Sequence, residues 1–245
     1  MARCGWACTH WASAAVPTAD WIDPMIGLSF AAAATSTIRI ATGVLLLPEH
    51  NPVLVAKQAA TLDTLSGGRL SLGIGIGWSR EEFDALGVPF ECRGTRTEEY
   101  VDAIRTLWRD DLASFDGEFV SFTGIRVNPK PLQDRRIPIV LGGNSDAALR
   151  RIVSWGDGWY GFNLDSVDAV AQRVAFLRRQ CSEHRRDPAE LRLAVALRDP
   201  KPGDAAKLAA LDIDELVLVE APPDDARDAA DWVRGLADRW MAKLV

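Results

Sequence analysis

Cysteine is scarce in this chain of 245 residues, with four thiols, at positions 4, 8, 92 and 181. They form no CxxC pair and no regular framework, which excludes a disulfide-stapled secreted domain. We expect reduced, mostly buried thiols and therefore a cytoplasmic protein. Cys4, Cys8 and His10 lie close together in the sequence, but no fourth ligand follows at a usual zinc spacing, so no metal site is predicted.

Blocks of positive charge and long apolar runs are also missing. Lys and Arg occur at most two in a row and the net charge is −6, which argues against a nucleic-acid partner. No apolar run approaches the length of a membrane span. The N-terminus has no unbroken apolar stretch of the kind found in signal peptides, so we expect no membrane association.

Residues 38–78 are the most informative stretch of the sequence. Two nearly continuous apolar runs, 38–47 and 70–76, flank residues 53–65, whose apolar side chains recur at helical spacing. This pattern predicts a strand–helix–strand unit. Strands that are apolar at consecutive positions are typical of parallel strands covered on both faces. Both runs contain glycine near their ends, where backbone can approach a ligand closely.

Strands and helices alternate along the rest of the chain. Further strands are predicted to begin near residues 137, 158, 191 and 215, with a doubtful one near residue 6, and helices at 24–34, 95–109, 146–155, 167–185 and 224–244. Such alternation predicts a parallel sheet with right-handed crossovers. A closed barrel needs eight strands. We therefore expect an α/β fold: a TIM (β/α)8-type barrel, incomplete because its first strand and helix are missing.

The whole chain, residues 1–245, is predicted to form a single barrel domain with one insertion near 110–136. Residues 115–127 alternate in polarity and contain Asp116-Gly117, a hairpin signal, and we expect this hairpin to cross the barrel mouth.

Ligands of parallel barrels bind at the C-terminal ends of the strands. Gly142, Gly143, Asn144 and Ser145 follow one predicted strand and precede a helix, where free amides and the helix dipole favour a phosphate. Asn144 or Ser145 could equally be an ordinary helix cap. Gly75-Ile76-Gly77-Trp78 is either a tight strand exit or a wall for a flat ring, and GxGxG alone is weak evidence.

Four segments together resemble one known family: IATGVLLLPEHNP, KQAATLDTLSGGRLSLGIGIGW, EEFDALGVPFECRGTR and PIVLGGNSDAALRRIVSWGDGW. They are similar to the bacterial luciferase-like flavin/deazaflavin-dependent oxidoreductases (luciferase-like monooxygenases) and occur in the family's order over residues 23–163. The resemblance implies a (β/α)8 barrel that binds coenzyme F420, an 8-hydroxy-5-deazaflavin, or alternatively FMN, together with a small-molecule substrate.

Carried over by position, the resemblance also implies a non-proline cis peptide at Gly43-Val44 and a strand exit at Gly158-Trp159. Asp63 and Arg69 are interpreted as a structural pair that holds a helix to a strand. The implied cofactor-binding residues are Thr42, Gly43, Val44, Gly75, Gly77, Trp78, Arg96, Gly142, Gly143, Asn144, Ser145, Gly158 and Trp159.

The N-terminus departs from the family pattern. Gly5 to His10 is the only candidate for the family's second strand, with His10 in the proton-transfer position and Thr9 where an acidic residue would stand. Three explanations remain open for the missing first strand: a start codon further upstream, a homodimer that closes the barrel, or a degenerate relative.

The predicted function is hydride transfer by a deazaflavin to or from a small organic substrate. The alternatives are an FMN-dependent monooxygenase with a reductase partner and a non-catalytic cofactor-binding barrel. An unrelated phosphate-binding barrel enzyme is disfavoured because no Lys or paired carboxylate is recognised at the strand ends, apart from Glu220.

Overall fold

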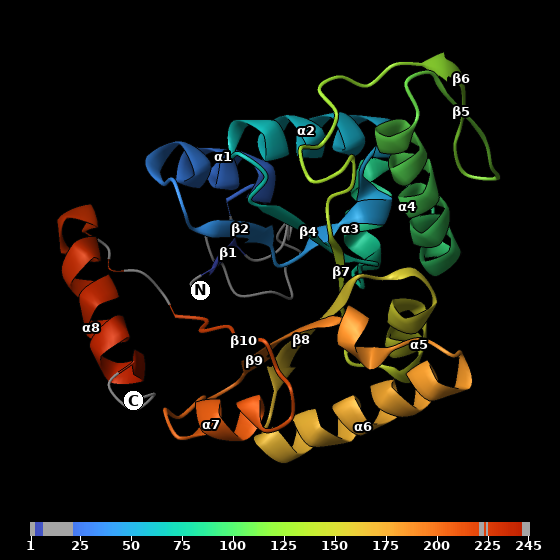
Figure 1. Cartoon of the computed structure of the whole chain (residues 1–245). Coiled ribbons are helices and arrows are strands. Elements are labelled where there is room, and N and C mark those ends of the chain that lie inside the picture. Colours follow the sequence, from blue (N-terminus) through green and yellow to red (C-terminus); the bar gives the residue numbers. More distant parts are fainter. Residues whose placement is uncertain (1–2, 7–21, 221–222, 224, 242–245) are drawn as a thin grey trace. The chain divides into compact units, whose positions relative to one another are not determined.

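The computed structural model describes residues 3–6, 22–220, 223 and 225–241 (Figure 1). The chain divides into two compact units, Met1–Leu141 and Gly142–Val245, which are described separately. The single domain over 1–245 stays a prediction.

The first unit has four parallel strands in the order β1-β2-β4-β7, with the short β3 paired to β4. All six residues of β4 are buried, as expected for a strand covered on both faces. The elements of this unit are β1 (Arg3–Trp6), α1 (Pro24–Ala34), β2 (Arg39–Thr42), β3 (Leu45–Leu46), η1 (Leu47–Glu49), α2 (Pro52–Leu65), β4 (Leu70–Gly75), α3 (Arg80–Leu86), α4 (Arg93–Arg109), β5 (Ala113–Asp116), β6 (Ser121–Ile125) and β7 (Ile139–Gly142).

Polar caps fix where the first helices begin. The Asp23 carboxylate accepts a hydrogen bond from Ile26 N at 2.9 Å, and Pro24 occupies the first turn of α1. The Asn51 side chain accepts from Val53 N and Leu54 N at the start of α2. These caps satisfy amides that have no partner within the helix, so the predicted boundaries of both helices are confirmed within one residue.

The predicted strand 38–47 is interrupted. Ile40 pairs with Leu70 in β2, whereas Leu45 pairs with Ile74 in β3, so the pairing against β4 shifts by one residue between them. The shift is a bulge at Gly43-Val44, whose peptide bond is cis as the resemblance implied.

Asp63 and Arg69 do not form the direct pair that the sequence suggested. The Asp63 carboxylate accepts from Leu132 N at 2.8 Å and Gln133 Nε2 at 2.7 Å. The Arg69 guanidinium instead donates to oxygens of Ala32, Thr35, Ile38 and Ser66. Both residues are structural, but each holds a different segment, because their partners come from distant parts of the chain.

The β5–β6 hairpin confirms the turn predicted at Asp116-Gly117. The prediction that the hairpin crosses the barrel mouth is wrong for the ends of the hairpin that join it to the rest of the chain. The hairpin follows the C-terminal end of α4, which lies on the side where helices lead back into strands. Its turn reaches back along α4 to Glu99, whose carboxylate accepts from Glu118 N, Phe119 N and Val120 N at 2.9, 2.7 and 2.8 Å. The hairpin is therefore clamped to the outer side of α4.

Replacing Glu99 by alanine is expected to lower the free energy of unfolding by about 2–4 kcal/mol, because three amides of the turn lose a charged acceptor. Urea denaturation measures the loss, and amide exchange of residues 118–120 should accelerate with it. Glu98→Ala, on the exposed face of the same helix, is the matched control and should cost less than about 1 kcal/mol. Equal effects of the two substitutions would contradict the clamp.

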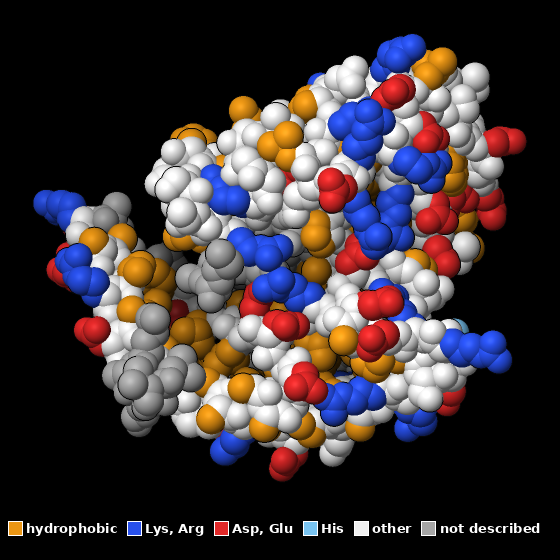
Figure 2. Space-filling model, viewed as in Figure 1, with side chains coloured by type: hydrophobic (Ala, Val, Ile, Leu, Met, Phe, Trp, Pro, Cys, Tyr) orange, Lys and Arg blue, Asp and Glu red, His pale blue; other side chains and the backbone are white. Residues whose placement is uncertain are grey.

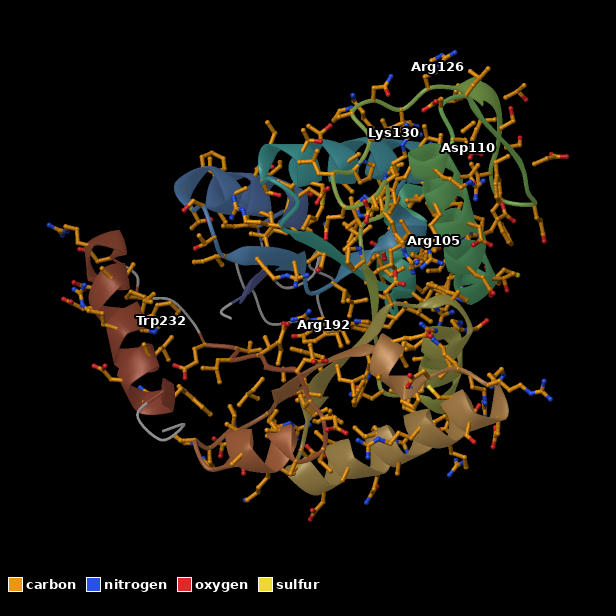
Figure 3. The ribbon with its side chains drawn as sticks, in the orientation of Figure 1. Arg105, Asp110, Arg126, Lys130, Arg192 and Trp232 are labelled. Atoms are coloured by element: carbon orange, nitrogen blue, oxygen red, sulfur yellow. The ribbon has the colours of Figure 1, made fainter. Side chains whose placement is uncertain are left out.

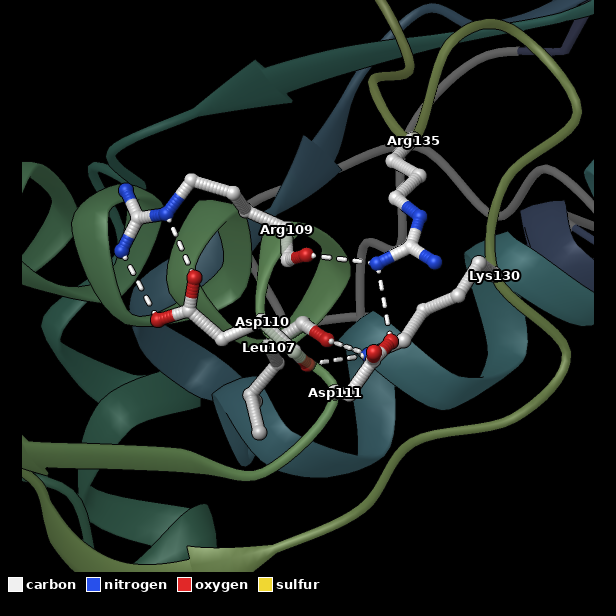
Figure 4. A network of polar contacts seen from close by, with 6 residues as sticks. All are labelled: Leu107, Arg109, Asp110, Asp111, Lys130 and Arg135. Atoms are coloured by element: carbon white, nitrogen blue, oxygen red, sulfur yellow. Dashed lines mark hydrogen bonds and ion pairs between the residues drawn. The ribbon is translucent and has the colours of Figure 1, made fainter.

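A second network holds the end of α4. Lys130 Nζ donates to the carbonyl oxygens of Leu107 and Asp110 at 2.7 and 2.5 Å, and Arg135 Nη1 donates to Arg109 O at 3.0 Å and to the Asp111 carboxylate at 2.8 Å (Figures 3 and 4). Burial lowers the pKa of the Lys130 ammonium. Cations here satisfy carbonyls that α4 leaves unpaired and complement its dipole, so the long segment 126–136 is held against the helix.

The second unit continues the alternation, with β8, β9 and β10 in parallel. Arg186 donates to the carbonyl oxygens of Ile152, Val153 and Gly156 at the end of α5, and Arg192 pairs with Glu215 between β9 and β10. The last strand begins at the predicted residue 215 and is only two residues long, and the closing helix begins at Ala229 rather than at the predicted residue 224. The elements are α5 (Asp146–Trp155), β8 (Gly158–Leu164), α6 (Val167–Glu183), η2 (Pro188–Glu190), β9 (Arg192–Leu197), α7 (Asp204–Ala209), β10 (Glu215–Leu216), η3 (Ala226–Asp228) and α8 (Ala229–Met241).

The architecture is an α/β fold of the TIM-barrel type. Within the described ranges, all strand pairs other than the β5–β6 hairpin are parallel, and the doubtful strand near residue 6 is confirmed as β1. Figure 2 shows Lys and Arg side chains interspersed with Asp and Glu on the face in view. Among the helices that the structure describes, none is long and apolar enough to span a membrane.

Candidate cofactor site

The exits of β2 and β4 touch each other in the first unit. Thr42 is buried, and its Oγ1 donates to Gly73 O at 2.6 Å. A Cβ added to Gly75 would lie 2.8 Å from Val44 Cγ2, so a side chain at 75 would collide with the residue that follows the cis peptide. The structure therefore brings together Thr42, Gly43, Val44 and Gly75, as predicted.

The β4 exit continues into a tight loop that ends at α3. Gly77 has a φ of +74°, a conformation that favours glycine, and its carbonyl accepts from Arg93 Nε at 3.1 Å. Trp78 follows with a side chain that is 58% exposed. A tightly held loop beside a large exposed aromatic residue can present a wall to a flat ring.

Sequence reasoning missed two buried carboxylates near this loop: Glu49, whose Oε1 lies beside Gly77, and Glu82, which interacts with Glu49. Glu49 is 7% exposed and Glu82 is 2% exposed. Burial, followed by repulsion from Glu82, raises the pKa of Glu49 from 4.5 to about 7. The expectation that no paired carboxylate stands at the strand ends is therefore wrong. A charged residue directly after a buried apolar strand, as in Pro48-Glu49-His50, was the available signal.

Arg96 lies on α4 and is almost fully buried. Its Nη1 donates to Pro89 O at 2.5 Å, and its guanidinium lies 5.0 Å from the centre of the Phe119 ring in the hairpin turn. These contacts hold the loop before α4 and the hairpin together. The cofactor-binding role that the resemblance implies for Arg96 stays a prediction.

The second unit contains the predicted anion loop at the start of α5. Ser145 caps the helix, with Oγ accepting from Ala148 N at 3.2 Å, and its side chain is exposed. Gly143 has a φ of +124°. Asn144 Nδ2 donates to Phe162 O at 2.8 Å, while Asn144 Oδ1 is buried and has no hydrogen-bond partner among the described residues. Arg173 pairs with Asp146 at 2.7 Å and so offsets the negative charge nearest the loop.

Gly158 and Trp159 do not form a strand exit, so that prediction is wrong. They begin β8, whose C-terminal end is Leu164. A Cβ at Gly158 would lie 2.3 Å from Arg192 O, so the glycine is explained by the close approach of β9. Trp159 is fully buried and its Nε1 donates to Gly143 O at 2.9 Å, which makes it a support for the loop.

The predicted proton-transfer residue His10, together with Thr9 and Cys8, lies outside the described residues. Of the described cysteines whose side chains are placed, Cys181 is buried and Cys92 is exposed. The expectation of mostly buried thiols therefore stays a prediction.

The residues present fit a flavin-type cofactor. The first turn of α5 offers amides and a hydroxyl to a phosphate, and the unpartnered Asn144 Oδ1 can accept from a hydroxyl of a sugar-like chain. The glycine exits and Trp78 offer surfaces for a ring. That the two groups of residues form one site stays a prediction.

Known proteins of one family are similar to this chain. Residues 5–198 match the sequence pattern of the luciferase-like monooxygenases. An uncharacterized protein of Mycobacterium tuberculosis is 39% identical over 217 residues, which cover 88% of this chain and 75% of that protein. The FMNH2-dependent dimethylsulfone monooxygenase of Pseudomonas putida is 35% identical over 153 residues, which cover 61% of this chain and 42% of that protein.

Among solved structures, an F420-dependent secondary alcohol dehydrogenase in complex with an F420-acetone adduct has the same fold. The TM-score is 0.66 at 20% sequence identity, with 78% of this chain and 58% of that chain covered. The match over residues 5–198 takes in the end of β1, both strand exits and the anion loop. The chain therefore belongs to the luciferase-like monooxygenase family.

Proposed function

We propose that this protein is an oxidoreductase that uses the deazaflavin coenzyme F420 to transfer a hydride to or from a small organic substrate. The observation that carries the proposal is the start of α5, where the exposed Ser145 hydroxyl, first-turn amides and the unpartnered Asn144 Oδ1 occur together in a chain of this family. These groups suit a ligand with both phosphate and hydroxyl groups.

The bound cofactor would supply the hydride chemistry, and the protein would supply orientation, proton transfer and shielding from water. Gly142, Gly143, Asn144 and Ser145 would hold the phosphate end of the cofactor. The exits at Gly43-Val44 and Gly75, Gly77 and Trp78 would back the ring. His10 remains the proposed proton-transfer residue.

FMN is the alternative cofactor, in a monooxygenase supplied by a separate reductase. The name of the Pseudomonas putida relative favours this second reading. A non-catalytic cofactor-binding barrel is the third candidate function. The difference matters because a deazaflavin carries hydride but does not activate dioxygen as a reduced flavin does.

Fluorescence titration of the whole chain with F420 and, separately, with FMN distinguishes these proposals. We expect a micromolar or lower dissociation constant for F420 and weaker binding of FMN. Tighter binding of FMN would favour the monooxygenase. Failure of both to bind at micromolar concentration would sink the oxidoreductase proposal.

Ser145→Ala is expected to weaken cofactor binding by about 1–3 kcal/mol because a hydrogen bond to a charged phosphate is lost. Ser166→Ala is the matched control, since Ser166 caps α6 through the same contact, Oγ to Ala169 N at 3.2 Å. Both variants lose a cap, so their stabilities should fall by similar amounts. An unchanged dissociation constant for Ser145→Ala would mean that Ser145 is a cap and nothing more.

A further inference from the structure

Glu49 is a buried carboxylic acid in contact with the predicted ring-binding exit. It ends η1, which follows β3 directly. Its Oε1 lies 3.1 Å from the position that a Cβ on Gly77 would take, and the same Cβ would lie 2.6 Å from the Phe83 ring. The Glu49 carboxyl group and the Phe83 ring therefore pack beside the Gly77 backbone and leave no room for a side chain there.

Neither oxygen of Glu49 has a hydrogen-bond partner among the described residues. Burying a charged carboxylate without a partner is very unfavourable, so such a group keeps its proton instead. Glu82, which reaches the same place from α3, adds a like charge that favours the protonated form further. Burial and the neighbouring charge of Glu82 therefore both favour a proton on Glu49.

Two arginines in the first turn of α4 have partners other than Glu49. On α4, Arg93 donates to Gly77 O and stacks on Phe90, and Arg96 donates to Pro89 O. His50 follows Glu49 in the sequence. Burial lowers the pKa of its imidazole, and the negative charge of Asp23 partly opposes this shift. Because neither Glu49 oxygen has a hydrogen-bond partner among the described residues, proton uptake is the way to neutralise this carboxylate.

We propose that Glu49 is a positioning residue for the cofactor site: its protonated carboxyl group, beside Glu82, supports the loop of residues 75–78, and ionisation of Glu49 loosens that loop. The proposal deepens the proposed function, on which its consequence for cofactor affinity rests. The claim that the protonated Glu49 supports the loop concerns the cofactor-free protein alone and does not depend on the proposed function.

The pH dependence has a definite sign. Because the pKa of Glu49 is raised from 4.5 to about 7 in the folded protein, the unfolded chain loses its proton first as the pH rises. The folded state therefore binds more protons across this interval, and stability falls from pH 4.5 to about 7 and levels off above. A glutamine at position 49 removes this dependence.

The first test uses the cofactor-free protein. Carbon-13 NMR of labelled glutamate carboxyl groups should show one resonance, absent in Glu49→Gln, that titrates near pH 7. We take the hydrogen-exchange rates of residues 75–78 as the ratio of wild type to Glu49→Gln. This ratio should rise by up to about thirtyfold between about pH 5.5 and 8.5, the limit for one group whose pKa falls from about 7 to 4.5 when the loop opens. Glu98→Gln, at an exposed position, is the control and should match the wild type at both pH values.

Glu82→Gln provides a second variant that tests the pair itself. It removes the neighbouring charge, so the Glu49 resonance should titrate at lower pH than in the wild type, while burial alone should keep it above 4.5. An unchanged midpoint would show that the two carboxylates do not interact. A Glu49 resonance that titrates below about pH 5 in the wild type would overturn the proposal.

The second test measures the dissociation constants of F420 and FMN for wild type and Glu49→Gln. For each cofactor, we take the ratio of the dissociation constant of the wild type to that of Glu49→Gln, because titration of the cofactor itself affects both constants equally and cancels. We expect a ratio within twofold of unity at about pH 5.5 and about five- to tenfold weaker binding by the wild type at about pH 8.5. A constant ratio would overturn the link to the cofactor site. Absence of binding by both proteins would count against the proposed function instead, while the NMR and exchange results would still decide the role of Glu49.

Discussion

Replacing Gly73 by alanine is expected to lower the free energy of unfolding by about 3–5 kcal/mol, enough to prevent folding of a marginally stable domain. A Cβ at this position would lie 2.0 Å from the carbonyl oxygen of Thr42 and 3.0 Å from its carbonyl carbon. These are backbone atoms of the adjacent strand, so no rotation of a side chain can relieve the overlap. Urea denaturation followed by circular dichroism measures the loss.

Relieving this overlap requires β2 and β4 to move apart, and that movement should also disturb the predicted cofactor site. Thr42 Oγ1 donates to Gly73 O at 2.6 Å, and Thr42 directly precedes the cis peptide at Gly43-Val44. Any Gly73→Ala protein that folds should therefore bind the cofactor more weakly than the wild type. Gly203→Ala is the control, because no atom lies within 4 Å of the added Cβ, and its stability should stay within about 1 kcal/mol. Similar stabilities of the two variants would contradict the close approach of β2 and β4.

Replacing Arg69 by methionine is expected to cost about 3–5 kcal/mol, for a different reason. Its guanidinium donates to Ser66 O at 2.5 Å, to Thr35 Oγ1 and O at 2.9 Å, to Ile38 O at 2.7 Å and to Ala32 O at 2.9 Å. Methionine fills a similar volume but leaves these oxygens without a donor. The result would be a loosened junction between the end of α1, the start of β2 and the end of α2.

Lysine at position 69 should recover only part of the loss, because an ammonium group has three donors and no planar fork. Arg80→Met is the matched control in the same unit. Arg80 pairs with Glu91 at 2.8 Å on the surface, with both side chains more than half exposed, so its loss should cost less than about 1 kcal/mol. Comparable losses for Arg69→Met and Arg80→Met would rule out the role given to Arg69.

Local patterns predicted most of the elements correctly. The bounds of α1 and α5 agree with the prediction because each begins at a capping residue, Asp23 or Ser145, that acts within three residues of its own position. The β4 strand was recognised because consecutive apolar residues are required where both faces of a strand are covered. The hairpin was recognised because Asp-Gly favours a tight turn wherever it occurs.

Errors occurred where a residue's role depends on a distant segment. Gly158 was assigned to a ligand rim, although the backbone of Arg192 in β9 explains it. Asp63 and Arg69 were paired because they are close in sequence, but their partners lie up to 70 and 37 residues away. Glu49 and Glu82 were overlooked because the local signal, a charged residue directly after an apolar strand, concerns Glu49 alone and does not show that a second carboxylate is buried beside it.

The sequence by itself determined the α/β alternation, the helix caps, the glycine-rich strand exits and the family. These follow from periodicity and short-range hydrogen bonding, which act over a few residues, and from motifs that occur in a fixed order. Only the tertiary structure decided which glycines adjoin another backbone, which oxygens Arg69 holds and that Glu49 is buried beside Glu82. Those properties depend on desolvation and on close approach between segments, and both arise only when distant parts of the chain pack together.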